Sequence, residues 1–229
     1  ILDKEHKLVA VVCRNGSDYA RKDIGDVLNM PKQDCEIVEI QDCKRVLIKN
    51  IDVMIDFSYR TMSIEVAQIC NELAVKSVIC TTGFSQKEEL IFKELAMKPN
   101  SGILYAPNLT IGVNLLIEFV KKISKLLPDY DFEIIERHRR DKPRVTTTAK
   151  IIAKAIDREN INISSIRVGG YVGLHEVTAA NENERLTIIH ESFSRNAFAT
   201  SALVAADFIK SRCGYYVMQD IIEKMENNI

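Results

Sequence analysis

The stretches Val53-Met-Ile-Asp-Phe57, Ser77-Val-Ile-Cys-Thr81 and Gly102-Ile-Leu-Tyr-Ala106 decide the fold of this 229-residue chain. Each is nearly continuous in apolar residues, as strands of a parallel sheet are when helices cover both of its faces. Residues 62–73 between them have helical periodicity, and Ser85 with Glu88 has the spacing of a capping box that opens a helix to about residue 97. With two earlier strand-like runs, 8–13 and 36–40, this alternation predicts an α/β domain with a Rossmann-like parallel sheet.

The pattern changes after residue 108. We expect helices at 111–126, 149–156 and 196–210, and strands at 131–137, 164–168, 174–180 and 185–191. The last three strands follow one another without intervening helices, which indicates a mostly antiparallel sheet in a second, α+β domain. The predicted division is therefore 1–107 with 214–229 for the Rossmann-like domain, and 108–213 for the α+β domain.

Composition excludes several classes of function. The chain has 31 Lys and Arg against 32 Asp and Glu, so no overall field favours nucleic acid or an anionic membrane. No apolar run is long enough to span a bilayer, and residues 1–7 lack a secretory pattern, so we expect a cytoplasmic protein. The six cysteines lack the spacing of metal ligands, which favours reduced thiols without a metal role.

Polar segments follow the predicted parallel strands where a ligand would bind. Parallel sheets bind ligands at the carboxyl ends of their strands. Those ends read Cys13-Arg-Asn-Gly16, Phe57-Ser58, Thr81-Thr-Gly-Phe84 and Ala106-Pro-Asn108. From the residues alone, the Thr-Thr-Gly turn is equally a simple strand end, and Asn108 is equally a helix cap.

A second candidate site is a local positive cluster around His138. Arg137, Arg139, Arg140, Lys142 and Arg144 surround it in the sequence of a nearly neutral protein, which suits a dianionic ligand. The alternative is a solvated basic loop with an incidental histidine.

Six segments, taken together and in order, resemble the dihydrodipicolinate reductase family over nearly the whole chain. They are Asp52-Val-Met-Ile-Asp-Phe-Ser58, Thr81-Thr-Gly-Phe84, Ala106-Pro-Asn-Leu-Thr-Ile-Gly-Val-Asn114, Glu133-Ile-Ile-Glu-Arg-His-Arg-Arg-Asp-Lys142, Arg167-Val-Gly-Gly-Tyr-Val-Gly-Leu-His175 and His190-Glu-Ser-Phe-Ser-Arg-Asn-Ala-Phe-Ala199. The resemblance implies an enzyme of lysine and diaminopimelate biosynthesis that reduces 4-hydroxy-tetrahydrodipicolinate, a cyclic unsaturated dicarboxylate, with NADPH or NADH.

The resemblance also implies roles for residues. His138 would be the catalytic proton donor and Lys142 the cation that holds the substrate, with Arg139, Thr147 and Thr148 also binding it. The cofactor would contact Arg14, Phe57, Thr81, Thr82, Gly83, Ala106, Pro107 and Asn108. The first domain would bind the nucleotide, and the second would bind the substrate and form a homotetramer. For His175 we expect a hydrogen-bonded structural role, whereas Arg195 has two open roles, binding a substrate carboxylate or a structural one.

The chain departs from the family pattern in its first strand. The family opens with a strand and a Gly-x-x-Gly-x-x-Gly loop that cradles the cofactor pyrophosphate, whereas this sequence starts at what resembles the second strand. The first strand is central in a Rossmann sheet, so its absence would leave a gap of about 10 Å between the strands at 8–13 and 53–57. We expect that upstream residues are missing from the sequence; the rival is a natural variant whose sheet has closed differently.

Two further departures concern the predicted sites. The loop Lys142-Pro-Arg-Val-Thr-Thr-Thr-Ala149 is one residue shorter than the family's Lys-x-Asp-x-Pro-Ser-Gly-Thr pattern, and Thr147 stands where glycine is usual, an unfavourable choice for a positive φ. Arg139 replaces a second histidine. Cys13 replaces an acidic ribose-binding residue, which together with Arg14 favours NADP.

These departures leave two alternatives to the reductase open. One is a catalytically silent relative that serves as a ligand-binding or assembly scaffold. The other is a reductase of a different cyclic imine or carboxylate.

Overall fold

The computed structural model of the chain describes residues 5–48 and 51–227. It divides into two compact units: Ile1–Pro107 with Ala206–Tyr216, and Asn108–Ala205 with Val217–Ile229. The boundary after Pro107 coincides with the expected one, whereas the C-terminal region is divided differently. Residues 206–213 group with unit 1, and the helix α8 (Met218–Glu226) groups with unit 2 because it packs against α5 (Ile111–Leu126).

Unit 1 contains the predicted parallel sheet. Its strands are β3 (Val53–Asp56), β4 (Lys76–Ile79) and β5 (Gly102–Tyr105), all parallel, and β10 (Gly214–Val217) lies beside β5 at the edge. The helices α3 (Arg60–Glu72) and α4 (Gln86–Ala96) alternate with these strands. The predicted capping box is confirmed, because Ser85 and Glu88 each bind the other's backbone amide. The predicted α/β fold is therefore confirmed.

A smaller parallel pair precedes this sheet. It consists of β1 (Val11–Cys13) and β2 (Ile37–Glu39), with the short helix α1 (Ile24–Val27) between them. A 3-10 turn, η1 (Ile40–Asp42), and α2 (Cys43–Leu47) follow. No described strand joins this pair to the four-stranded sheet, so the gap expected between residues 8–13 and 53–57 appears as a division into two sheets. The six cysteine thiols are free.

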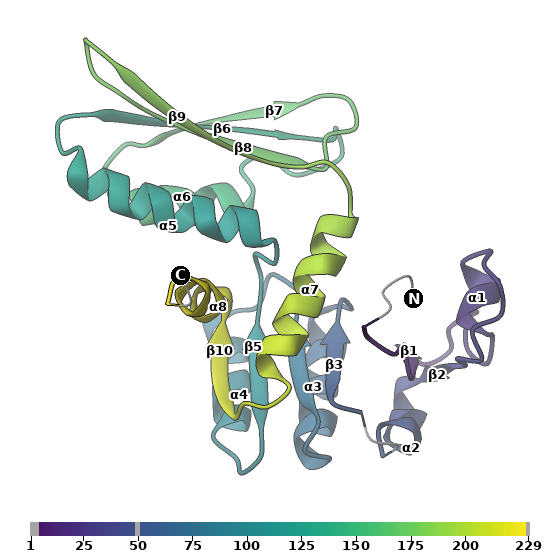
Figure 1. Cartoon of the computed structure of the whole chain (residues 1–229). Coiled ribbons are helices and arrows are strands. Elements are labelled where there is room, and N and C mark those ends of the chain that lie inside the picture. The colour runs from purple at the N-terminus through teal and green to yellow at the C-terminus, as the bar shows by residue number, and fades with distance from the viewer. Residues whose placement is uncertain (1–4, 49–50, 228–229) are drawn as a thin grey trace. The chain divides into compact units, whose positions relative to one another are not determined.

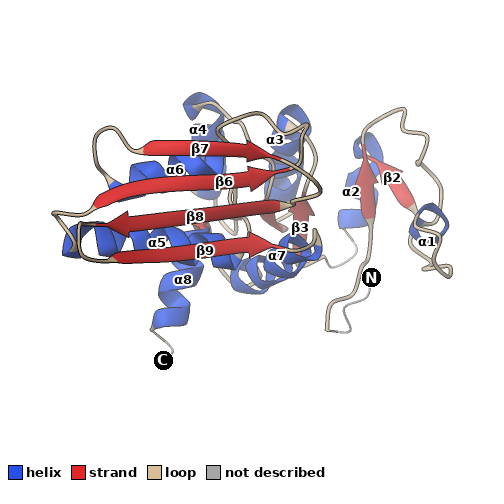
Figure 2. Ribbon diagram, turned by 90° about the horizontal axis from the view of Figure 1, so that it is seen from above, coloured by secondary structure: helices blue, strands red, loops and turns tan. Residues whose placement is uncertain are grey.

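Unit 2 is built on a mixed sheet of order β7-β6-β8-β9. Its strands are β6 (Asp131–His138), β7 (Asn162–Arg167), β8 (Gly173–Ala180) and β9 (Arg185–Ser192). Only the β6–β7 pair is parallel, so the predicted mostly antiparallel sheet is confirmed. α5 and α6 (Thr147–Ile156) cover one face of this sheet, as Figures 1 and 2 show, and α7 (Asn196–Ile209) follows β9.

The helix-covered face of this sheet is apolar at one end and polar at the other. Side chains of a strand alternate between faces, so every second residue of β6 points toward the helices. Phe132 and Ile134 pack with Ile152 of α6 and Val177 of β8 in an apolar core. Further along β6 the same face carries Glu136 and His138, both buried. The fold thus brings charged and titratable groups to one end of a buried face.

Within the part of the chain that the structure describes, no helix has both the length and the apolar character needed to cross a bilayer.

Candidate active site

A row of polar side chains crosses the polar end of the β6–β9 sheet. Glu136 pairs in register with Ser165 of β7 and with His175 of β8, and His175 pairs with His190 of β9. Directly opposite residues on adjacent strands point to the same face, so these four side chains share the helix-covered side. The predicted proton donor, His138, lies two residues beyond Glu136 on the same face.

One nitrogen of the His138 ring forms a hydrogen bond, and the other has no partner among the described residues. The residue is 6% exposed, and its Nδ1 lies 3.1 Å from the carbonyl oxygen of Val172. A carbonyl only accepts, so Nδ1 carries the hydrogen and Nε2 is the acceptor in the neutral ring. Nε2 is buried and has no hydrogen-bond partner among the described residues. Burial lowers the pKa of His138, partly offset by the hydrogen bond that His138 donates to the Val172 carbonyl.

Two further imidazoles lie beyond His138. The His175 ring meets the His138 ring edge-on, with centroids 5.3 Å apart. Burial lowers the pKa of His175 to about 3, and His138 adds to this effect. Neither nitrogen of His175 has a hydrogen-bond partner within the described residues, so the hydrogen bonds expected for a structural role are not formed there. His190 is half-buried, and burial lowers its pKa as well.

Two glycines make room for these rings. A Cβ on Gly173 would lie 2.9 Å from Cε1 of His138, and a Cβ on Gly112 would lie 2.6 Å from Cδ2 of His190. Real Cβ atoms do not approach that closely, so each imidazole occupies space that only glycine leaves open.

Glu136 is the fully buried acid of this cluster. Its carboxylate accepts hydrogen bonds from the Thr146 backbone and hydroxyl, from Ser165 Oγ at 2.7 Å and from Arg167 Nη2 at 2.6 Å. Burial by itself raises the pKa of a carboxylate, but the hydrogen bonds from Thr146, Arg167 and Ser165 outweigh it and bring the pKa of Glu136 to about 2. Glu136 is therefore a permanent anion at neutral pH.

The cluster raises the question of a metal site. Glu136, His138 and His175 each offer a ligand atom within 4.8 Å of the others. However, both Glu136 oxygens already accept hydrogen bonds, and the Arg167 guanidinium is ion-paired with one of them. A divalent cation would have to displace these donors and sit beside a positive charge, so this geometry favours a hydrogen-bonded cluster over a metal centre.

The loop after β6 and the first turn of α6 carry the predicted substrate-binding residues. Lys142 is exposed, and Arg139 is exposed and forms an ion pair with Asp141 at 2.8 Å. Thr147, which stands where the family has glycine, is the first residue of α6 and does not have a positive φ. Val145 takes that conformation instead, with φ of 55°, a strained choice for a β-branched residue.

One contact joins a predicted substrate residue to a predicted cofactor residue. The hydroxyl of Thr148 donates to Oδ1 of Asn108 at 2.7 Å, and both residues belong to unit 2. Asn108 and Thr148 are 40 residues apart in the sequence.

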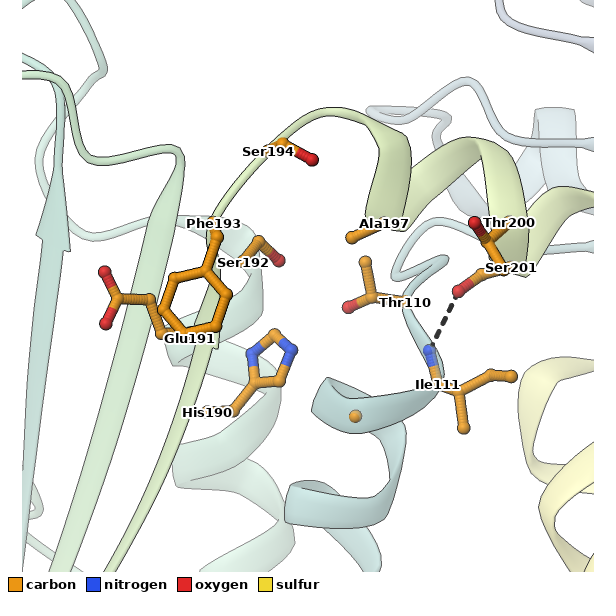
Figure 3. A pocket seen from close by; sticks show the side chains of 11 residues that line it. Thr110, Ile111, His190, Glu191, Ser192, Phe193, Ser194, Ala197, Thr200 and Ser201 are labelled. Carbon is orange, nitrogen blue, oxygen red and sulfur yellow. Dashed lines mark hydrogen bonds between the residues drawn. The ribbon is translucent and has the colours of Figure 1, made fainter. Parts of the chain in front are cut away.

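A shallow pocket of about 350 Å³ opens near His190 in unit 2. Figure 3 shows His190 beside the start of α5, with Ser201 of α7 accepting from the amide of Ile111 at 3.2 Å. The lining comprises Thr110, Ile111, Gly112, His190, Glu191, Ser192, Phe193, Ser194, Ala197, Thr200 and Ser201. It includes none of the predicted site residues. Arg195, next to this segment, is exposed.

Comparison with known proteins identifies the family. The profile described as "Dihydrodipicolinate reductase, N-terminus" matches residues 1–109, and "Dihydrodipicolinate reductase, C-terminus" matches residues 112–222. The chain belongs to the dihydrodipicolinate reductase family. The predicted enzyme class, an NAD(P)H-dependent oxidoreductase of lysine and diaminopimelate biosynthesis, is therefore confirmed.

Individual reductases support this assignment. The chain is 32% identical to the 4-hydroxy-tetrahydrodipicolinate reductase of Methanopyrus kandleri, covering 97% of this chain and 89% of that protein. It is 33% identical to the enzyme of Nitrosomonas europaea, covering 94% and 88%. The solved structure of a dipicolinate-bound dihydrodipicolinate reductase from Paenisporosarcina sp. TG-14 shares the fold, with a TM-score of 0.73 at 24% identity over 94% of this chain and 89% of that one.

The reductase's predicted cofactor residues in unit 1 lie at strand ends. The N-terminal domain is a nucleotide-binding fold consistent with NAD(P)H. Thr81, Thr82 and Gly83 follow β4, and Gly83 has φ of 85° with open space where a side chain would be. Phe57, after β3, is 58% exposed, and Arg14 after β1 is exposed. Thr82 and Gly83 are exposed like Phe57 and Arg14, whereas Thr81 is buried.

Two of the predicted cofactor contacts are less accessible. Ala106 is fully buried, and its amide donates to Ile79 at 2.8 Å, so its methyl group is not presented to a ligand. The hydroxyl of Thr81 donates to Asp56 at 2.9 Å and is thereby already engaged. Pro107 is half-buried.

Sequence reasoning missed the buried polar residues that support both regions of the reductase. In unit 1, Asp56 accepts from Ser58, Ser63 and Thr81 and so ties together the ends of β3 and β4. In unit 2, Glu136, Ser165 and Arg167 surround the loop that carries Lys142. A charged residue at the strand period of a buried face, as at Glu136, is a signal that marks such a position from the sequence.

Proposed function

We propose that this chain reduces 4-hydroxy-tetrahydrodipicolinate with a hydride from NADPH or NADH, with His138 as the proton donor and Lys142 as the cation that binds a substrate carboxylate. The observation that carries this proposal is the unpartnered Nε2 of His138, held in place through Nδ1 and followed within four residues by the exposed ammonium of Lys142.

The chemistry explains why these groups are needed. The bound nicotinamide would supply a hydride, which leaves negative charge on the conjugated part of the substrate. A protonated imidazole neutralises that charge by transferring its proton, and fixed cations lower the barrier further. Binding a dianion beside His138 also raises the pKa of the imidazole, which favours the protonated form when substrate is present.

The carboxylates of the substrate have matching donors. The first-turn amides of α6, including those of Thr147 and Thr148, have no helical carbonyl to bind, and the positive end of the helix dipole points the same way. Lys142 and Arg139 add charge. The hydrogen bond from Thr148 to Asn108 holds the first turn of α6 in place.

For the cofactor, we propose that Arg14, Phe57, Thr81, Thr82, Gly83, Pro107 and Asn108 surround it, with Ala106 contributing backbone only. Arg14 favours the 2′-phosphate of NADPH over NADH because no acidic residue stands at Cys13 to accept from a ribose hydroxyl. The unit ending at Pro107 would be the nucleotide-binding domain.

We also propose that the chain assembles as a homotetramer through the face of the β6–β9 sheet that α5 and α6 do not cover. Ile166 and Ile189 are on that face and are 38% and 57% exposed. Assembly would remove such apolar area from water.

Steady-state kinetics test the proposal. Purified chain is expected to show saturable enhancement of NADPH fluorescence and to oxidise NADPH when 4-hydroxy-tetrahydrodipicolinate is added. Binding of NADPH without oxidation by this substrate would overturn the proposed reaction and favour another cyclic imine or a silent scaffold. Absence of nucleotide binding would reject every reductase function.

A further inference from the structure

Three side chains of the sheet form hydrogen bonds with the loop from Lys142 to Thr146. Arg167 donates from Nε to the Lys142 carbonyl at 2.9 Å and from Nη2 to the Pro143 carbonyl at 2.6 Å. Ser165 Oγ accepts from the Val145 amide at 3.0 Å. Glu136 accepts from the Thr146 amide at 3.1 Å and from its hydroxyl at 2.5 Å.

These three side chains also bind one another. Arg167 and Ser165 both donate to Oε1 of Glu136, at 2.6 and 2.7 Å. The side chains of Arg167 and Glu136 are 6% and 0% exposed, so the ion pair is shielded from solvent. We call Glu136, Ser165 and Arg167 the loop clasp. A buried charge pair with all of its hydrogen bonds made is rigid, because breaking any one bond leaves a charge unsatisfied.

The clasp holds a conformation that the loop would not keep by itself. Val145 is β-branched and has φ of 55°, which costs energy relative to an extended conformation. Its amide donates to Ser165, Thr146 after it donates to Glu136, and Pro143 two residues before it accepts from Arg167. The clasp therefore maintains the strained turn, and this turn fixes the position of the Lys142 backbone and of the start of α6.

We infer that Glu136, Ser165 and Arg167 are positioning residues that hold Lys142 and the first turn of α6 in the geometry for binding a dicarboxylate. None of the three needs to touch the substrate. This inference rests on the proposed function for its substrate class, and it adds three residues that act through the backbone of the loop.

A second arginine provides a matched control. Arg158 donates to the backbone carbonyls of Ser124 in the last turn of α5 and of Leu127, Pro128 and Tyr130 in the connection to β6. Like Arg167, it holds a connection next to β6 through several carbonyl oxygens. It is not paired with a carboxylate in the described structure, and the site residues of unit 2 follow the other end of β6.

The test compares R167K with R158K in the full chain. A lysine at position 167 retains the charge beside Glu136 but cannot reach the carbonyls of Lys142 and Pro143 at the same time. We expect R167K to raise KM for the dicarboxylate roughly tenfold, with a smaller change in kcat and an unchanged Kd for NADPH. R158K is expected to leave KM unchanged. S165A, which keeps the ion pair, is expected to raise KM a few-fold, roughly threefold.

Amide hydrogen exchange separates this inference from the proposed function. Exchange at Val145 and Thr146 is expected to quicken in R167K and S165A and to stay at the wild-type rate in R158K, whether or not a dicarboxylate binds. Wild-type exchange at both amides in R167K and S165A would overturn the clasp. Faster exchange with an unchanged KM would overturn its positioning role. A wild-type chain that binds no dicarboxylate would overturn the proposed function, with the clasp still judged by exchange.

Discussion

At each end of β6 an arginine side chain binds backbone carbonyls of the adjacent connection, but the surroundings of the two arginines differ. Before β6, Arg158 binds four backbone carbonyls and stacks over the ring of Phe132, with 4.7 Å from its guanidinium carbon to the ring centroid. After β6, Arg167 binds loop carbonyls but also pairs with a buried carboxylate next to His138 and His175. The first end is surrounded by apolar core, and the second by titratable groups. Apolar packing stabilises the first end, whereas hydrogen bonds and a buried ion pair position the titratable groups at the second.

Ile134→Ala gives the largest expected effect and tests the apolar end. Ile134 is fully buried between β8 and α6, so the truncation leaves a cavity and should lower the free energy of unfolding by about 2–5 kcal/mol. Urea unfolding measures it, and kcat per folded molecule should be unchanged. Leu186→Ala, at a position 42% exposed, is the control and should cost clearly less. An equal loss of unfolding free energy in both variants would contradict the difference between the buried and the exposed position.

His138→Ala tests the polar end. If His138 is the proton donor, turnover should fall by about 10²-fold or more, equivalent to about 2.7 kcal/mol of transition-state stabilisation. Steady-state kinetics at saturating NADPH measure it, and a thermal melt checks that the fold is retained. Turnover within a few-fold of wild type would reject the catalytic assignment while leaving the clasp intact.

The pH dependence of stability sharpens the contrast between the ends. His175 has a folded pKa of about 3, below its ordinary value of 6.5, so the unfolded chain binds the proton first on acidification. Its stabilising effect is complete above pH 6.5 and is lost as the pH falls toward 3. Between pH 7 and 5 the free energy of unfolding should drop by about 2 kcal/mol from this residue.

His175→Gln is expected to flatten that slope, as measured by urea unfolding at several pH values. His190→Gln, at a half-buried position, is the matched control and should flatten it less. A slope unaltered by His175→Gln would show that His175 already titrates normally in the folded chain.

Thr148→Val gives the smallest effect. It keeps the shape of the side chain but removes the hydroxyl that donates to Asn108, at a cost of about 1 kcal/mol. Dicarboxylate affinity by calorimetry should weaken a few-fold. Thr178→Val removes a similar contact to Thr187 on the uncovered face, and it should leave that affinity unchanged.

The sequence was sufficient for most elements of both units because their signals are local. The apolar runs of β3, β4 and β5 and the capping box of α4 depend only on neighbouring residues, and both were predicted correctly. The short α1 and the edge strand β10 were not predicted: α1 has only four residues, and β10 is defined by pairing with a strand over 100 residues earlier.

Only those residues of the candidate site that belong to a sequence motif could be predicted. His138 and Lys142 follow from the basic segment and the family pattern. The roles of Ser165 and Arg167 depend on strand register, which brings them to Glu136 from about 30 residues away. Sequence spacing places Thr147 where the family has glycine, but spacing alone does not show that Val145 takes the positive φ.

Gly112 and Gly173 have a consequence for the history of this chain. Each leaves a hollow shaped to an imidazole, so the identities at 112 and 190, and at 173 and 138, are expected to change together. A descendant with alanine at either glycine can keep its backbone conformation only if a smaller side chain replaces the facing histidine. Reversing such an exchange would then require two mutations in the right order, which makes the histidines difficult to regain once they are lost.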